Sequence, residues 1–286
     1  MSRVVAGVLL FTSTVFAASP EVGDLVRRSV ENNERSWKAA PAYTFTEADV
    51  ITKSGKTTRR KYRVLMIEGS QYNQLIAENG EPLGPARVAT EQKKLGREIA
   101  RRRSESASAR SRRVAQYQRE RRQDRAMMSE MVKAFNFKLA GREQMNGRDC
   151  WVLDATPRPG YRPSSYQTKA LTGMRGRMWI DTREYQWVKV HAEVFRPVAF
   201  GLFIAHVQPG TEFTLEEAPI GNGLWMPRRL VTKVRATALL FWSENSVDDE
   251  TYTDYRLQPA DIRTAASART APAAANTSRG SSQTQR

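Results

Sequence analysis

Hydrophobic and polar positions follow two different spacings along the chain. Between residues 21 and 37, apolar residues recur every three or four positions among charged ones, which predicts an amphipathic helix ending before Pro41. From residue 43 onward, short runs rich in β-branched and aromatic residues are separated by turn dipeptides such as Ser54-Gly55 and Asn79-Gly80. This punctuation, at intervals of about ten residues, predicts an antiparallel meander.

Ten or eleven strands are expected in all, because one long run can hold either one strand or two. The expected runs are 43–52, 61–67, 71–77, 135–139, 148–156, 176–181, 186–195, 212–218, 224–242 (one or two strands) and 250–257.

A basic insertion at about residues 87–132 interrupts this meander. Within 91–125, 13 Lys and Arg stand against 5 Asp and Glu. Good helix formers without proline favour a long helix here. Residues 101–113 (RRRSESASARSRR) have no apolar face to bury, so they fit either an exposed helix or a partly disordered segment.

Three further segments stand apart from the meander. The first is the apolar run 198–207 (VAFGLFIAHV), which fits a buried helical turn that plugs the sheet or a lid that touches a membrane. The second, residues 259–286, is rich in Ala, Ser, Thr and Arg without periodicity and is expected to be a disordered tail. The third is the N-terminus, where Arg3, an apolar stretch and small residues around Ala17 indicate a signal peptide over residues 1–17. We therefore expect an exported, soluble, periplasmic protein.

Composition excludes several classes of site. One cysteine cannot form an internal disulfide, and one cysteine with two histidines cannot build a Cys/His zinc site. The formal net charge is +16, but outside the signal peptide, the segment 91–125 and the tail, 28 basic residues face 24 acidic ones. The basic character therefore belongs mostly to the insertion, and the folded body from 18 to 258 without residues 91–125 carries a net charge of only +4.

Catalytic chemistry finds little support in the sequence. His191 shares a strand face with Lys189 and Glu193, which fits a relay but fits a polar strand face better. His206 and Cys150 are expected to be packed side chains. Nucleophile-elbow, P-loop, Rossmann and HExxH motifs are absent from the sequence. We expect no catalytic residue, no metal and no cofactor.

The insertion suggests an electrostatic partner instead. Nucleic acid is not expected for an exported chain, whereas anionic lipid head groups attract basic side chains. The alternative is a helix that is simply solvated. The residues expected to bind an anionic surface are Arg101, Arg102, Arg103, Arg110, Arg112 and Arg113.

Four stretches carry a resemblance to a known family. They are YTFTEADVITKSGKTTRRKYRVLMIEGS (43–70), KLAGREQMNGRDCWVLDATPRPGY (138–161), GRMWIDTREYQWVKVHAEV (176–194) and PGTEFTLEEAPIGNGLWMPRRLV (209–231). With the N-terminal helix and the inserted helical segment, they resemble the LolA/LolB-like superfamily of periplasmic lipoprotein-sorting proteins. The strand starts G-x-x-W-I-D at Gly176 and G-x-W-x-P at Gly223 belong to this resemblance. The Arg-rich insertion is longer and more basic than the sorting carriers lead us to expect.

The resemblance implies a mainly β (α+β) fold, a strongly curved antiparallel half-barrel whose helices cover a hydrophobic cavity for acyl chains. The expected function is a non-enzymatic carrier or sensor of lipid or lipoprotein acyl chains. The alternatives are a fully packed envelope interaction protein that docks a partner or an anionic membrane through its Arg-rich helix, and a hydrolase at the His191 face. The residues expected to line the acyl cavity, unless they are ordinary core, are Tyr43, Phe45, Trp151, Leu153, Trp179 and Trp225.

Overall fold

The computed structural model describes residues 21–165, 167–200, 205–238 and 242–259. The predicted signal peptide at 1–17 and the predicted tail, apart from Pro259, lie outside these residues. The helical elements are α1 (Val22–Ala39), η1 (Ala40–Ala42), α2 (Pro85–Arg103), α3 (Ala107–Ala134) and η2 (Gln167–Gly173). Among the described helices, none combines the length and the apolar character needed to cross a bilayer.

The strands form one antiparallel sheet. They are β1 (Tyr43–Lys53), β2 (Lys56–Ile67), β3 (Ser70–Glu78), β4 (Glu81–Pro82), β5 (Phe135–Met145), β6 (Arg148–Pro157), β7 (Met174–Asp181), β8 (Trp187–Val194), β9 (Val198–Phe200), β10 (Ala205–Val207), β11 (Glu212–Gly221), β12 (Leu224–Ala238) and β13 (Trp242–Leu257).

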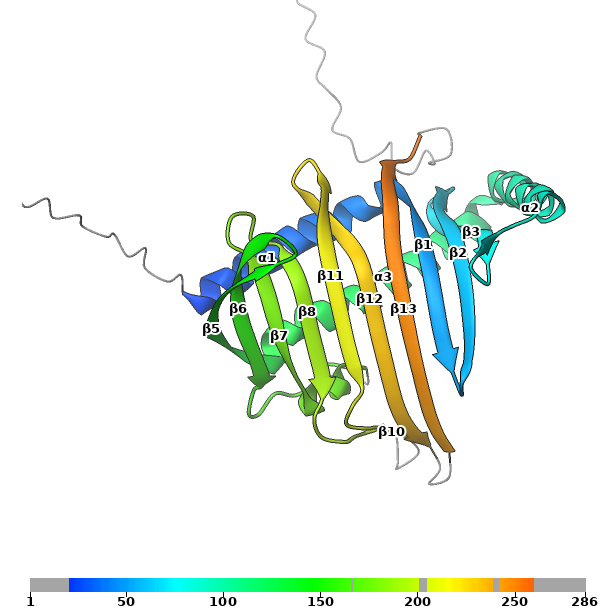
Figure 1. The fold of residues 1–286 in the computed structure, drawn as a ribbon. Helices are drawn as coiled ribbons and strands as arrows, with labels where there is room; N and C mark the ends of the chain where they lie inside the picture. The colour runs from blue at the N-terminus through cyan, green and yellow to red at the C-terminus, as the bar shows by residue number, and fades with distance from the viewer. Residues whose placement is uncertain (1–20, 166, 201–204, 239–241, 260–286) are drawn as a thin grey trace, which may run out of the picture.

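The spatial order of this 13-stranded sheet is β4-β3-β2-β1-β13-β12-β11-β8-β7-β6-β5, with β10 pairing β12 and β9 pairing β10. The order begins at β4 and ends at β5, so the sheet is an open half-barrel, as predicted. In Figure 1 helices α1 and α3 cross behind the strands, on one face of the sheet. We call this the helix face and the opposite side the open face.

Several predicted hairpin turns are confirmed. Ser54 and Gly55 have φ of 50° and 77°, and Asn146 and Gly147 have φ of 52° and 75°. Two successive positive φ values give the tight turn whose twist matches antiparallel strands, and Asn and Gly tolerate that conformation best.

Three strand predictions need correction. β2 begins at Lys56 rather than at 61, β13 begins at Trp242 rather than at 250, and 224–238 is a single strand. The run 198–207 is not a helical plug, because its described ends are the paired strands β9 and β10. The strand number of 13 exceeds the expected ten or eleven because β4, β9 and β10 have only two or three residues.

The helix face carries one register row that crosses ten strands. Directly paired residues along it, from β5 to β3, are Leu139, Leu153, Met178, Val190, Leu215, Leu230, Glu250, Asp49, Arg60 and Glu78. Six apolar residues are thus followed by four charged ones, with the change between β12 and β13. The main apolar core lies over the first group, where Leu25 and Val26 of α1 pack.

The insertion forms two consecutive helices, α2 and α3, separated by residues 104–106, and neither one long helix nor a partly disordered segment. Arg102, whose side chain is 7 % exposed, joins the end of α2 to the β2–β3 turn. Its Nη1 donates to the carbonyl oxygens of Ile67 and Ser70, both at 2.8 Å, and its Nη2 donates to Gln71 O at 3.2 Å. Since a guanidinium offers five N–H donors, one buried arginine satisfies three carbonyl groups.

Candidate functional site

A groove of about 830 Å³ opens between α1 and α3, beside the start of β5. Its apolar lining comes from three valines of α1, spaced one helical turn apart, and from one residue each of α3 and β5. These are Val22, Val26, Val30, Val132 and Phe137. Spacing by four residues places the three valines on one side of α1. The same apolar side of the helix therefore packs Val26 into the core and lines the groove.

The two helices are tied together away from this groove. Arg125 of α3 pairs with Glu34 of α1 and donates to Asn33 Oδ1 at 3.3 Å. The guanidinium of Arg121 lies 4.1 Å from the ring centroid of Trp37, a cation–π contact. At the groove end the rim ion pairs stay within one helix, as with Lys133 and Glu130 at 2.8 Å.

Arg158 lies at the groove and carries a charge that no described carboxylate pairs. Its Nε donates to Asn136 Oδ1 at 3.2 Å and its Nη2 donates to Phe135 O at 3.1 Å. Both acceptors are neutral, so they orient the guanidinium without neutralising it. A guanidinium held in this way is suited to a carboxylate or phosphate.

Glu217 joins α1 to the sheet. The residue is 7 % exposed, and its Oε1 accepts a hydrogen bond of 3.1 Å from Asn33 Nδ2. Burial raises the pKa of Glu217 to about 8, while the bond from Asn33 acts in the opposite direction. The carboxyl is therefore mostly protonated at neutral pH.

Glu47, on β1, is a second carboxyl group whose pKa is raised. Burial first, and then the neighbouring charges of Asp49 and Glu250, raise its pKa to about 7. Despite this cluster, no group of three or more His, Cys, Asp and Glu side chains is arranged for a metal within the part of the chain that the structure describes.

These raised pKa values predict that stability falls as pH rises. Between about pH 4.5 and 8 the unfolded state has released the Glu217 proton while the folded state keeps it, so the folded state binds more protons. Each pH unit in this range should cost on the order of 1 kcal/mol from this group. We expect Glu217→Gln to flatten the decline of the melting temperature, leaving the part due to Glu47. Glu216→Gln, at an ion pair with the exposed Arg228, is the control and should keep the wild-type slope. An unchanged slope in Glu217→Gln contradicts the prediction.

The six residues predicted to line an acyl cavity lie in three separate places. Leu153 is 0 % exposed within the core under α1, and Trp151 packs at the edge of that core. Trp179 and Trp225 belong to a second buried cluster with Cys150 and Val152, which alternate with Trp151 and Leu153 and so face the other side of the sheet.

Tyr43 and Phe45 lie on β1, away from both clusters. The ring of Phe45 stacks against Tyr255, with centroids 5.1 Å apart, and meets Tyr252 at 5.9 Å. The predicted packing of Cys150 is confirmed, since the residue is 0 % exposed and burial raises the pKa of its thiol to about 11.

Five of the six predicted surface arginines already have partners, either within α2 and α3 or at the β2–β3 turn. Arg101 and Arg113 both pair with Glu105, at 3.0 and 2.7 Å. Arg103 and Arg110 each lie 3.6 Å from Glu68, and Arg102 holds the β2–β3 turn. Arg112 differs from the other five, because it is exposed and no described carboxylate pairs with it.

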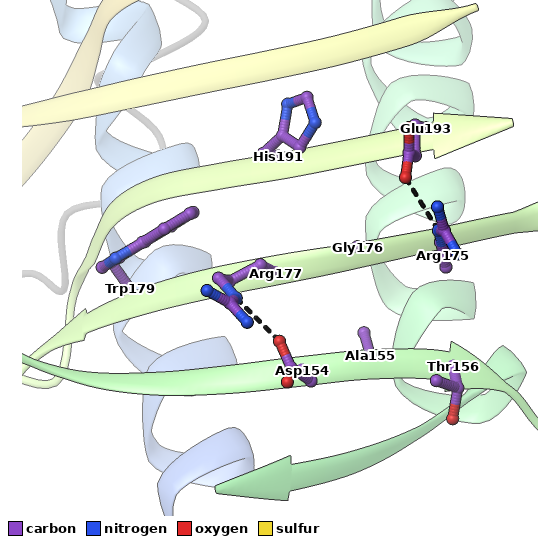
Figure 2. Close-up of a pocket in the computed structure, with 9 residues that line it drawn as sticks. All are labelled: Asp154, Ala155, Thr156, Arg175, Gly176, Arg177, Trp179, His191 and Glu193. Carbon is purple, nitrogen blue, oxygen red and sulfur yellow. Dashed lines mark hydrogen bonds and ion pairs between the residues drawn. The ribbon is translucent and has the colours of Figure 1, made fainter. Parts of the chain in front are cut away.

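His191 lies in a shallow hollow of about 500 Å³ on the open face (Figure 2). The charged side chains around it are already paired, Arg177 with Asp154 and Arg175 with Glu193, each at 2.7 Å. His191 Nδ1 shares a hydrogen bond of 2.9 Å with Thr214 Oγ1. The relay considered from the sequence is not assembled, since Glu193 bonds to Arg175 and Lys189 lies over the ring of Trp179.

Comparison with known proteins finds similarity at the level of structure. No protein-family model matches the chain, and no curated protein matches it. A LolA superfamily protein from Nitrosomonas europaea matches with TM-score 0.33 and 13% identity, over 87% of this chain and 100% of that chain. A DUF1329 family protein from Desulfovibrio piger matches with TM-score 0.33 and 12% identity, over 85% of this chain and 99% of that one.

A third structure is a domain from Vibrio parahaemolyticus described as an outer membrane lipoprotein-sorting protein. It matches with TM-score 0.32 and 12% identity, over 83% of this chain and 97% of that chain. The family named from the sequence is thus found again among the matched structures.

Proposed function

We propose that the protein is a non-enzymatic carrier or sensor that binds the acyl chain of a lipid or a lipidated protein in the groove between α1 and α3. The observation that carries the proposal is the pairing of an apolar groove with an uncompensated arginine. The groove supplies Val22, Val26, Val30, Val132 and Phe137, and Arg158 lies beside them.

The energetics favour an amphiphile over a purely polar ligand. A volume of about 830 Å³ lies within the range of small-molecule sites. Each methylene group removed from water contributes about 0.8 kcal/mol, so a chain of a dozen carbons gains most of its affinity without a charged contact. Arg158 then orients the carboxylate or phosphate at the polar end.

Export from the cytoplasm belongs to the same proposal. A carrier of acyl chains with the signal peptide expected at residues 1–17 would work in the periplasm. The alternative is the packed interaction protein, with an apolar segment of a partner protein in the groove instead of an acyl chain. The buried Leu153 favours that alternative, because it fills the core under α1.

Filling the groove should abolish acyl binding. Gly23 lines the groove on α1, and a Cβ placed there meets only Glu21 Oε1, at 3.6 Å, which is ordinary contact. We expect Gly23→Trp to remain folded and to lower the affinity for a fluorescent fatty acid at least about tenfold, because the indole occupies the space of several methylene groups. Gly23→Ala is the matched control and should bind like the wild type.

The same assay examines the polar end. Arg158→Met should weaken binding of the fatty acid and leave binding of the corresponding fatty alcohol nearly unchanged. Absence of acyl binding by the wild type, or equal binding by Gly23→Trp, would refute the proposal. If Gly23→Trp instead abolishes capture of a partner protein and leaves acyl binding intact, the interaction protein is the correct function.

A further inference from the structure

A row of three exposed arginines follows the outer side of α3. Arg112, Arg119 and Arg122 are seven and three residues apart, which places them within about 80° of one another around the helix axis. All three are exposed, and no described carboxylate pairs with any of them. The one described polar partner is neutral, where Arg119 Nη2 donates to Gln116 Oε1 at 2.5 Å. We call Arg112, Arg119 and Arg122 the outer arginine row.

The row leads to the mouth of the groove. Ser129, which lines the groove, follows Arg122 by seven residues, close to two full turns, and so lies on the same side of α3. The rise of an α-helix places Ser129 about 10 Å beyond Arg122 and about 26 Å beyond Arg112. Lys133 extends the same side and lines the groove as well, with its side chain 68 % exposed.

From this arrangement we propose that the outer arginine row docks the protein on an anionic lipid bilayer, with the groove mouth directed at the membrane. Charge complementarity identifies the partner, because three neighbouring arginines that no described carboxylate pairs are attracted to a surface of anionic lipid head groups. The inference rests on the proposed function, because an acyl chain bound in the groove has a membrane as its natural source or destination. Of the six arginines that the sequence predicted to bind an anionic surface, only Arg112 belongs to the outer arginine row.

The open face provides a matched control. Arg59, Lys61 and Arg63 of β2 are exposed and alternate with Arg60, which faces the helices. Replacing these three removes the same charge from the opposite side of the sheet. Net charge alone therefore cannot distinguish the two variants, whereas a docking surface can.

The experiment uses the full-length chain and vesicles of phosphatidylglycerol and phosphatidylcholine at about 150 mM salt. Arg112→Gln/Arg119→Gln/Arg122→Gln should lower co-sedimentation about tenfold or more. Arg59→Gln/Lys61→Gln/Arg63→Gln should stay within about twofold of the wild type. Binding should weaken steeply with added salt, because the Debye length falls from about 8 Å at physiological ionic strength. An equal loss in both variants, or no loss in the row variant, would overturn the proposal.

Delivery of the fatty acid separates this inference from the proposed function. When a fluorescent fatty acid is supplied as monomers from cyclodextrin, the row variant should bind it like the wild type. When the same fatty acid is supplied in anionic vesicles, the row variant should take it up more slowly. If the wild type fails to bind monomers, the groove proposal falls while the sedimentation result still decides the docking surface.

Discussion

Leu153→Arg should unfold the domain. Leu153 is 0 % exposed, and its neighbours in the register row are Leu139 and Met178. The substitution removes a buried leucine, which alone costs about 2–5 kcal/mol, and it adds an unpaired charge that costs several kcal/mol more. Since small domains are stable by only about 5–15 kcal/mol, we expect the cooperative thermal transition in circular dichroism to disappear.

The control at this position keeps the volume and the apolar character. Leu153→Met should cost less than about 1.5 kcal/mol and should preserve a cooperative transition. The contrary outcome is informative about the site as well as the fold. A folded Leu153→Arg protein that no longer binds fatty acid would place the acyl chain at Leu153 rather than between α1 and α3.

Arg102→Ala should lower the free energy of unfolding by about 3–5 kcal/mol, the usual cost of removing one partner of a buried ion pair. The loss leaves three carbonyl oxygens of the β2–β3 turn without the donors described above and leaves Glu98 without one of its two arginine partners. Arg102→Lys should not restore the stability, since an ammonium cannot reproduce the planar set of donors. Urea denaturation measures the loss, and faster proteolysis within 104–106 would report release of α2 from the sheet.

The adjacent residue makes this test selective. Arg103 lies 3.6 Å from Glu68 and its side chain is 55 % exposed. Because Glu68 keeps Arg110 as a second partner at 3.6 Å, Arg103→Ala should lower the free energy of unfolding by less than Arg102→Ala does. Equal effects of the two substitutions would mean that total charge, and not the buried donors of Arg102, holds α2 to the sheet.

The elements that were predicted correctly are those that bury apolar side chains against the core. The helix starting near Val22 and strands such as β6 and β8 bury one side against the core, so their periodicity is visible in the sequence. The starts of β2 and β13 were missed for the opposite reason. Their residues 56–60 and 242–249 are mostly polar, because the helix face of these strands carries charged residues and needs no apolar cover.

The groove could not be predicted from the hydrophobic periodicity of the sequence, for a different reason. Pattern analysis identified the apolar positions within residues 21–37 as one face of an amphipathic helix, but it included none of them in the expected acyl cavity. Whether part of the face stays uncovered depends on where the end of α3 packs, which is set by contacts such as that between Arg125 and Glu34, 91 residues apart in the chain. No signal in the sequence marked Arg158, whose partners Asn136 and Phe135 are brought to it by the pairing of β5 with β6.

The register row also accounts for the failure of the sheet to close into a barrel. Closure would bring β5 alongside β3 and β4, so that Leu139 at one end of the row met Glu78 at the other. The carboxylate of Glu78 and its partners Arg60 and Arg87 would then be buried beside an apolar strand, and the desolvation of these charges would cost more than a few additional strand hydrogen bonds contribute. The free edges are protected instead, β4 by its length of two residues and β5 by the irregular pairing at Gly141 and by charged side chains. The protein is thus specified against self-association through both edges of its open sheet.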